Sequence, residues 1–439
     1  MTDDKRALLA RLLDQRARAP RRYPVSFGQQ RLLFLDRFAG GDDAVHNIPV
    51  AFHVAGPDDE RALRDALTVV VTRHDTLRTT FTGDDGDAVQ VVHPEARVEL
   101  EVTDLTPLGG DRAEGRRLAA ELGRRPFDLA AGPLLRAALI RLGPAEHIVA
   151  LSVHHIVSDA WSLGVLFAEL EAAYAGRGAQ LPDLPARYGD YAVRQREELT
   201  GAALEELLGF WRDHLRGAPA LLTLPADRPR PAVRANRGAV HYLTVPPAAV
   251  ARVTAFNQDA GVTMFMTLLA VFQEVLARHS GQDDVVIGTP VAGRTHPGLE
   301  PLIGFFVNSV PLRLSGAGRP SLRELVARAR EVTLDGLAHA GVPFERLVEE
   351  LRPERSTAHT PIFQAQLILQ NAPSSPFRLG AAAVTSLELD TGTAKVDLTL
   401  VGEARDDGED RQPTSQAREP AQVPRAGGVV DHPDREEQR

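Results

Sequence analysis

The chain has 439 residues, of which 43% are hydrophobic and 25% are charged, and its formal net charge is -9. This composition is typical of a soluble globular protein, and the length favours two lobes with large cores. The net negative charge, without a basic stripe that carries aromatic residues, argues against a nucleic-acid partner. The absence of cysteine excludes disulfides, thiolate metal sites and a cysteine nucleophile.

The first part of the chain predicts two helices with prolines between them. Residues 4–18 carry leucines on one side, which indicates an amphipathic helix that packs on its own domain or docks on an upstream protein. The N-terminus lacks the apolar core of a secretory signal, and the longest apolar run, residues 262–272, is too short to span a membrane. We therefore expect a cytoplasmic location and no membrane partner. Ser26 has the character of an N-cap and predicts the start of the second helix.

The next hundred residues alternate between helical and extended patterns. Residues 61–81 predict an amphipathic helix that runs into a strand. The alternating segments AVQVVHP and VELEVTDL predict two strands that pair with each other. Residues 110–123 predict a charged helix, and two further strands are expected on either side of residues 143–146.

Residues 147–175 predict a strand, a short loop and a helix. The segment from His147 to Val153 is apolar and β-branched, as in a buried strand, and Asp159 stands where the N-cap of the helix belongs. Successive side chains on a strand point to opposite faces, so only one of His154 and His155 can face a cavity. From these residues alone, two packed histidines and an ordinary helix cap explain the pattern equally well.

The second half of the chain predicts a helix over residues 204–216 and then an extended loop rich in proline and arginine. Residues 241–281 predict a strand and two helices, with Thr263 as the cap of the second helix. The segments VVIGTPV and FFVNSVPLRL predict strands, and residues 321–340 predict a helix. Beyond residue 402 the chain has no aromatic residue and many charges and prolines, which is the composition of disorder.

The segment HHIVSDA resembles the HHxxxDG signature of the condensation-domain superfamily, which is built like chloramphenicol acetyltransferase and works within nonribosomal peptide synthetases. Ala160 replaces the usual glycine, a change that is costly if the position needs a positive φ and harmless if it is the first helical residue. Further segments resemble other blocks of that family in the same order along the chain: SFGQQRLLFLDRF, TRHDTLRTTF, LPDLPARYGDYAVRQREEL, IGFFVNSVPLR, GVPFERLVEEL, RPERSTAHTPIFQAQLILQ and KVDLTL.

The resemblance implies an α/β fold, with α+β mixed sheets, in two chloramphenicol acetyltransferase-like lobes that form a V-shaped pseudodimer around a channel. We expect an N-terminal lobe over residues 1–180 that carries the HHxxxD motif, a C-terminal lobe over residues 181–402, and a disordered tail over residues 403–439. Family members continue through another strand and a closing helix, so the C-terminal lobe is expected to have an incomplete ending.

The function implied by the resemblance is amide bond formation. The α-amine of an acceptor aminoacyl thioester attacks a donor acyl or peptidyl thioester, and both substrates are carried on the phosphopantetheine arms of carrier proteins. The expected partners are those carrier proteins and the adenylation domains of the same assembly line, with no cofactor and no metal bound. An α-amine with a pKa of about 7.7–8.0 is already partly neutral near pH 7, so proximity is the largest contribution the protein can make.

The resemblance also assigns roles to single residues. His155 is expected to face the channel, where it accepts a proton from the attacking amine or orients that amine and stabilises the intermediate. His154 is expected to be structural, and Asp159 to hold the loop by pairing with Arg294. Asn308 lines the channel or is an ordinary strand-end amide. The remaining structural or channel positions are Ser158 and Trp161.

Three other functions remain open. One is a starter-type or free-standing acyltransferase that uses acyl-CoA or an acyl carrier. Another is a non-catalytic module that recruits other enzymes, although such members usually lose the second histidine and His155 is intact here. The last is an inactive truncated relic.

Overall fold

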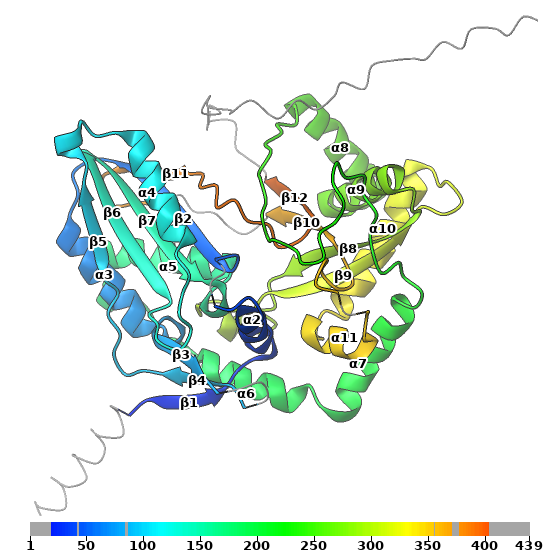
Figure 1. Ribbon diagram of the computed structural model, residues 1–439, viewed down its shortest axis with the longest axis horizontal. Helices are drawn as coiled ribbons and strands as arrows, with labels where there is room; N and C mark the ends of the chain where they lie inside the picture. The colour runs from blue at the N-terminus through cyan, green and yellow to red at the C-terminus, as the bar shows by residue number, and fades with distance from the viewer. Residues whose placement is uncertain (1–18, 42–43, 84–86, 355, 371–376, 404–439) are drawn as a thin grey trace, which may run out of the picture. The chain divides into compact units, whose positions relative to one another are not determined.

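The computed structural model describes residues 19–41, 44–83, 87–354, 356–370 and 377–403 (Figure 1). The residues up to Gly402 form one compact unit. The helix predicted over residues 4–18 lies outside the described residues, as does the predicted tail apart from Glu403. None of the described helices is by itself long and apolar enough to cross a membrane; one pair meets the criterion jointly but is bent by 107° between its two helices.

A five-stranded mixed sheet occupies one side of Figure 1. Its central strand, β7, is buried along almost its whole length because apolar clusters cover both of its faces. Helices α3 and α5 pack on one face and α4 on the other. Strands β5 and β6 run parallel and the other pairs are antiparallel. In order across the sheet, the strands are β11 (Ala383–Leu387), β2 (Asn47–Ala55), β7 (Glu146–His154), β6 (Leu135–Gly143) and β5 (Leu100–Asp104).

A three-stranded sheet lies beside it, in the order β1 (Arg21–Pro24), β4 (Val89–Val92) and β3 (Thr79–Thr82). The segment AVQVV is the strand β4, as predicted, but its partners are β1 and β3, whereas VELEVTD forms β5 and pairs with β6. The predicted pairing of these two segments with each other is therefore wrong. Alternation of side chains identifies a strand but does not identify its partner.

A four-stranded mixed sheet has a separate hydrophobic core. Buried aliphatic residues of β8 and β9, such as Ile287 and Leu312, pack against helices α9 and α10. Strand β8 pairs antiparallel with β9 and parallel with β10. The order of the strands is β12 (Leu398–Glu403), β10 (Ala365–Gln370), β8 (Asp284–Val291) and β9 (Asn308–Ser315).

The helices agree with most of the sequence predictions, and Ser26 and Thr263 cap α2 and α9 as expected. The α-helices are α2 (Phe27–Phe38), α3 (Glu60–Arg73), α4 (Arg112–Arg124), α5 (Ala160–Tyr174), α6 (Tyr188–Glu198), α7 (Gly201–His214), α8 (Pro247–Ala260), α9 (Met264–Ser280), α10 (Leu322–Ala338) and α11 (Phe344–Leu351). The 3-10 helices are η1 (Asp75–Arg78), η2 (Thr106–Leu108), η3 (His155–Val157), η4 (Gly178–Gln180) and η5 (Pro297–Leu299).

Three strand predictions in the second half need correction. Residues 241–245 form no strand: their side chains are exposed, and no described strand pairs with them. The strand predicted from FFVNSVPLRL begins only at Asn308, because the two phenylalanines belong to a loop that contacts α5. The strand predicted from KVDLTL begins at Leu398, which leaves Lys395 in the segment before it.

The chain crosses between the two larger sheets near its end. Strand β11 pairs with β2 in the five-stranded sheet, and β12 belongs to the four-stranded sheet, so residues 388–397 connect one sheet to the other. The predicted lobe boundary after residue 180 remains a prediction, and β11, which was expected in the second lobe, belongs to the sheet that carries the histidine pair.

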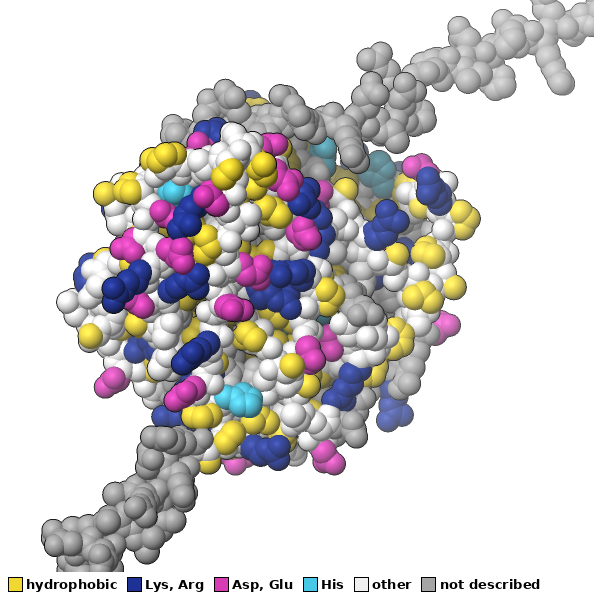
Figure 2. All heavy atoms as spheres, turned by 60° about the vertical axis from the view of Figure 1, so that its left-hand side comes forward, with side chains coloured by type: hydrophobic (Ala, Val, Ile, Leu, Met, Phe, Trp, Pro, Cys, Tyr) yellow, Lys and Arg dark blue, Asp and Glu magenta, His cyan; other side chains and the backbone are white. Residues whose placement is uncertain are grey.

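The outer face of α4 carries paired charges. Arg117 forms ion pairs with Glu114 at 2.7 Å and with Glu121 at 2.8 Å. Over the face shown in Figure 2, basic and acidic side chains are interspersed, without a continuous basic stripe. This face therefore lacks the pattern expected of a nucleic-acid interface.

Candidate active site

The candidate site begins where β7 ends. The last residue of β7 is His154, the short helix η3 starts at His155, and Asp159 caps α5 by accepting a hydrogen bond from the Ser162 N–H at 2.8 Å. The backbone N–H of His155 donates to the carbonyl of His46 at 2.8 Å. The change from strand to 3-10 helix separates the two neighbouring rings: His154 is buried, whereas His155 is partly exposed.

The hydrogen bonds of His155 fix which ring nitrogen carries the proton. Its Nδ1 lies 2.8 Å from the carbonyl oxygen of Ser158. A carbonyl can only accept, so in the neutral ring Nδ1 carries the hydrogen and Nε2 keeps its lone pair. No described residue bonds to Nε2, and this atom is not among the buried unpartnered ones. His155 therefore offers an accessible basic nitrogen.

His154 has the opposite arrangement. Its Nδ1 accepts a hydrogen bond from the Ile156 N–H at 3.1 Å, so its hydrogen lies on Nε2. The rings of Phe127 and His46 stand edge-on to it, with centroids 6.0 and 6.3 Å away. Its residue exposure is 2%, and no described acceptor bonds to its Nε2. This ring packs against its neighbours and offers no basic nitrogen.

Burial keeps both rings neutral. It lowers the pKa of His154 to about 3, with a smaller contribution from the positive charge of Lys395. Burial, followed by the charge of Lys395, also lowers the pKa of His155 well below its ordinary value. A neutral imidazole can accept a proton, so the protonation state of His155 suits a base or an acceptor of hydrogen bonds.

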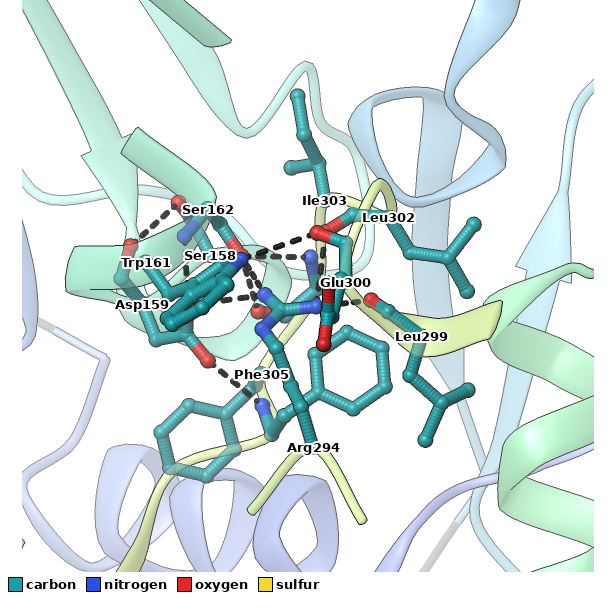
Figure 3. A network of polar contacts seen from close by, with 12 residues as sticks. Ser158, Asp159, Trp161, Ser162, Arg294, Leu299, Glu300, Leu302, Ile303 and Phe305 are labelled. Atoms are coloured by element: carbon teal, nitrogen blue, oxygen red, sulfur yellow. Dashed lines mark hydrogen bonds and ion pairs between the residues drawn. The ribbon is translucent and has the colours of Figure 1, made fainter. Parts of the chain in front are cut away.

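The carboxylate of Asp159 is saturated by donors (Figure 3). Its Oδ1 accepts from Ser162 N–H and from Nη2 of Arg294, the latter at 3.2 Å, and its Oδ2 accepts from the Phe306 N–H at 3.0 Å. The side chains of Asp159 and Arg294 are only 3% and 2% exposed. The structure thus places Asp159 in a buried joint between α5 and the loop after η5.

Arg294 holds the other side of this joint. Its Nη1 donates to the carbonyls of Leu299 and Leu302, at 2.5 and 3.0 Å, and its Nη2 donates to Ser162 Oγ at 2.7 Å (Figure 3). Its guanidinium also lies 4.1 Å from the ring centroid of Phe306. Burial lowers the pKa of Arg294, and Asp159 opposes that shift.

Ser158 and Trp161 complete the surroundings of Asp159. Ser158 is 1% exposed, and its carbonyl is the group that orients the ring of His155. Its hydroxyl donates to the Asp159 carbonyl at 3.4 Å. Trp161 donates from Nε1 to the carbonyl of Glu300 at 3.0 Å, which adds a second link between α5 and the loop that follows η5.

Asn308 uses its whole amide within the protein. Its Nδ2 donates to the carbonyls of Ala340 and Val342, at 2.9 and 2.6 Å. Its Oδ1 accepts from the N–H groups of Ser309 and Phe344, at 2.9 and 3.0 Å. These bonds tie the start of β9 to the start of α11.

Ala160, which stands in place of the motif glycine, is the first residue of α5 and is exposed. It is not among the described non-glycine residues with positive φ. The methyl group therefore lies at an ordinary helical position and requires no unusual backbone conformation.

Several residues of the site were not recognised from the sequence. Ser162 exchanges hydrogen bonds with the backbone of Gly304, at 2.8 and 3.0 Å. The ring of Phe305 stands edge-on to that of His155, with centroids 5.0 Å apart, and the hydroxyl of Tyr188 donates to the Phe305 carbonyl at 2.7 Å. Phe305 and Tyr188 lie in segments that the sequence singled out, but only the fold shows that they meet.

In the described part of the chain, no group of three histidine, aspartate or glutamate side chains is arranged to hold a metal ion. The described residues thus offer no metal centre beside the histidine pair, and the chemistry available there is that of a neutral imidazole and buried polar joints.

Comparisons with known proteins agree with this geometry. A family model described as "Condensation domain" matches residues 20–409. One of the proteins that make up the linear gramicidin synthase of Brevibacillus parabrevis is 43% identical over 393 residues, which are 86% of this chain and 5% of that protein. The chain thus spans a small fraction of the length of that relative.

Solved structures match over most of the described fold. The X-domain from teicoplanin biosynthesis, with 30% identity, has a TM-score of 0.81 and covers 88% of this chain and 87% of its own. The same X-domain in complex with OxyB has a TM-score of 0.77, with 31% identity over 88% and 85% of the chains. The first condensation domain of the CDA synthetase has a TM-score of 0.69, with 22% identity over 87% and 89%. The predicted fold class is confirmed.

Proposed function

The chain belongs to the condensation-domain family, and on this premise we propose that it forms amide bonds within a nonribosomal peptide synthetase. The donor is an acyl or peptidyl thioester and the acceptor is an aminoacyl thioester, each carried on the phosphopantetheine arm of a carrier protein. The protein itself needs no bound cofactor. Its partners are those carrier proteins and the adenylation domains that load them, in the cytoplasm.

The observation that carries this proposal is the orientation of the His155 ring. The Ser158 carbonyl holds the hydrogen on Nδ1, so that Nε2 can accept a hydrogen bond or a proton from the attacking amine. The neutral state of the ring at physiological pH supports the same role. His155 either takes the proton as a base or orients the amine and stabilises the charged intermediate.

The other site residues support His155 without taking part in the chemistry. Asp159 has three donors on its two oxygens, which leaves it poorly suited to accept a substrate proton. We assign Asp159 and Arg294 to the joint that places Phe305 beside His155. Ser158 orients the ring, and Trp161 strengthens the same joint. Asn308 holds β9 to α11, since its amide has no donor left for a substrate. His154 fills space behind the site.

The experiment compares the purified chain with its His155→Ala variant, using donor and acceptor substrates loaded on carrier proteins. We expect amide formation in a single turnover, measured by the mass of the carrier-bound product, and a loss of about 10²-fold or more in the variant. The urea midpoint of the variant should match that of the wild type. His279→Ala, an exposed histidine of α9, is the matched control and should retain the full rate.

Two outcomes would overturn the proposal. An unchanged rate in His155→Ala would remove this residue from the reaction. Amide formation from coenzyme A-bound donors but not from carrier-bound donors would assign the chain to the free-standing acyltransferases.

A second candidate is a recruitment module, favoured by the high structural similarity to the teicoplanin X-domain, which has been solved in complex with OxyB. A module of that kind would bind a partner enzyme and form no amide. The same assay separates the two functions, because a recruitment module would give no product with either wild type or variant.

A further inference from the structure

The segment that crosses between the two larger sheets carries the only lysine in the described part of the chain, Lys395. Its backbone is anchored on both sides of this residue. The carbonyl of Lys395 accepts a hydrogen bond from Arg234, Val396 is buried in the core of the four-stranded sheet, and Asp397 forms an ion pair with Arg230. The side chain of Lys395 itself is exposed to solvent. The fold thus fixes the position of this ammonium while leaving it accessible.

The ammonium of Lys395 lies close enough to the histidines of the site to act on them electrostatically. Its positive charge contributes to the lowered pKa of His155, His154 and His46. These rings come from η3, from the end of β7 and from the segment before β2. Lys395 forms no ion pair or side-chain hydrogen bond within the described ranges, so no carboxylate there neutralises its charge.

The other charged groups around these rings are also cations. Arg31 of α2 acts on Lys395 and on His46, and Arg234 acts on His46. Arg31 contacts Glu345 at 3.4 Å, and its guanidinium lies 4.8 Å from the ring centroid of Phe344. The surrounding protein and the charge of Arg31 lower the pKa of Lys395 to about 8. The result is a region of positive potential beside Nε2 of His155.

We propose that Lys395 is a positioning residue for the condensation reaction, because its charge holds the acceptor amine beside His155 in the neutral form that can attack. This inference rests on the proposed function. A cation close to an amine disfavours the ammonium, which has no lone pair to react with. The same potential favours the negative charge that develops on the thioester oxygen during attack.

The reaction then balances without any further reactant. The amine nitrogen forms a bond to the thioester carbon, and the carbon–sulfur bond breaks. The amine proton passes to Nε2 of His155 and from there to the departing sulfur. The products are the amide on the acceptor arm and a free thiol on the donor arm.

The first test compares the pH dependence of kcat/KM in the wild type with Lys395→Met and Lys395→Arg. Removing the charge should move the acid limb of the profile upward by about one pH unit, because the amine then holds its proton to higher pH. The arginine variant keeps the charge and should keep the wild-type profile. A profile of unchanged shape in Lys395→Met, whether or not the rate falls, would overturn the inference.

The second test needs no activity. Lys5 and Lys395 are the only lysines in the chain, so the Lys5→Arg variant retains one. Reductive ¹³C-methylation of this variant allows the pKa of Lys395 to be read from its NMR shift. We expect a value near 8, and an ordinary value of about 10.4 would overturn the inference.

The outcomes separate the two proposals. A wild-type chain that forms no amide overturns the proposed function and, with it, the role of Lys395. A wild-type chain that forms amide, together with an unshifted profile in Lys395→Met, overturns only the role of Lys395.

Discussion

The turn at His155 and the joint at Asp159 and Arg294 are close in sequence and in space, yet they are built in opposite ways. In the joint, both carboxylate oxygens and both Nη atoms of the guanidinium are bonded within the protein. In the turn, one ring nitrogen is bonded and the other is left for a substrate. Saturated polar groups hold parts of a protein together, and an oriented but unsaturated group is available for chemistry.

The largest expected effect tests the structural side of this comparison. Asp159→Ala leaves Arg294 buried without its partner, so we expect the free energy of unfolding to fall by about 3–5 kcal/mol in urea denaturation. Asp259→Ala is the matched control, because it breaks the exposed Arg323–Asp259 ion pair and should cost less than about 1 kcal/mol. A small loss in Asp159→Ala, similar to that of the control, would show that the joint does not hold the fold.

A smaller effect follows from the buried ring of His154. Its pKa is lowered to about 3 in the folded protein, while an unfolded histidine has a pKa of about 6.5. Between these values the unfolded chain binds more protons, so stability is complete above pH 6.5 and falls as the pH is lowered. At pH 5 this histidine should cost about 2 kcal/mol.

The measurement is urea denaturation at pH 7 and pH 5. The difference between the two pH values should be smaller by about that amount in His154→Gln than in the wild type. An equal difference in both proteins would contradict the assignment of His154 as a buried neutral ring.

The smallest effect concerns the motif position that departs from the family. Since Ala160 is an exposed first residue of α5, Ala160→Gly should change the free energy of unfolding by less than about 1 kcal/mol and leave the rate of amide formation unchanged. A tenfold faster variant would show that the methyl group obstructs the site.

The sequence predicted the elements around the site well, because β7 and α5 carry strong local signals. A buried apolar run marked the strand and Asp159 marked the helix start, and both are confirmed. It failed where the partner of a segment decides the outcome. The strand β4 pairs with β1 and β3 instead of β5, and residues 241–245 find no strand partner among the described residues.

The same limit applies to the site. The pairing of Asp159 with Arg294 came from the resemblance and not from spacing, since the two residues are 135 positions apart. The contact of Phe305 with His155 and the position of Lys395 depend on a loop and a crossover whose paths no local pattern encodes. Long-range geometry of this kind appears only when the chain is folded.

The central claim is that His155 presents an unprotonated Nε2. It can be tested directly by long-range ¹H–¹⁵N correlation spectra of the protein labelled at its 14 histidines, with His155→Gln used to assign the signal. At pH 7 we expect the pattern of a neutral ring with its hydrogen on Nδ1. A hydrogen on Nε2, or a doubly protonated ring, would contradict the account.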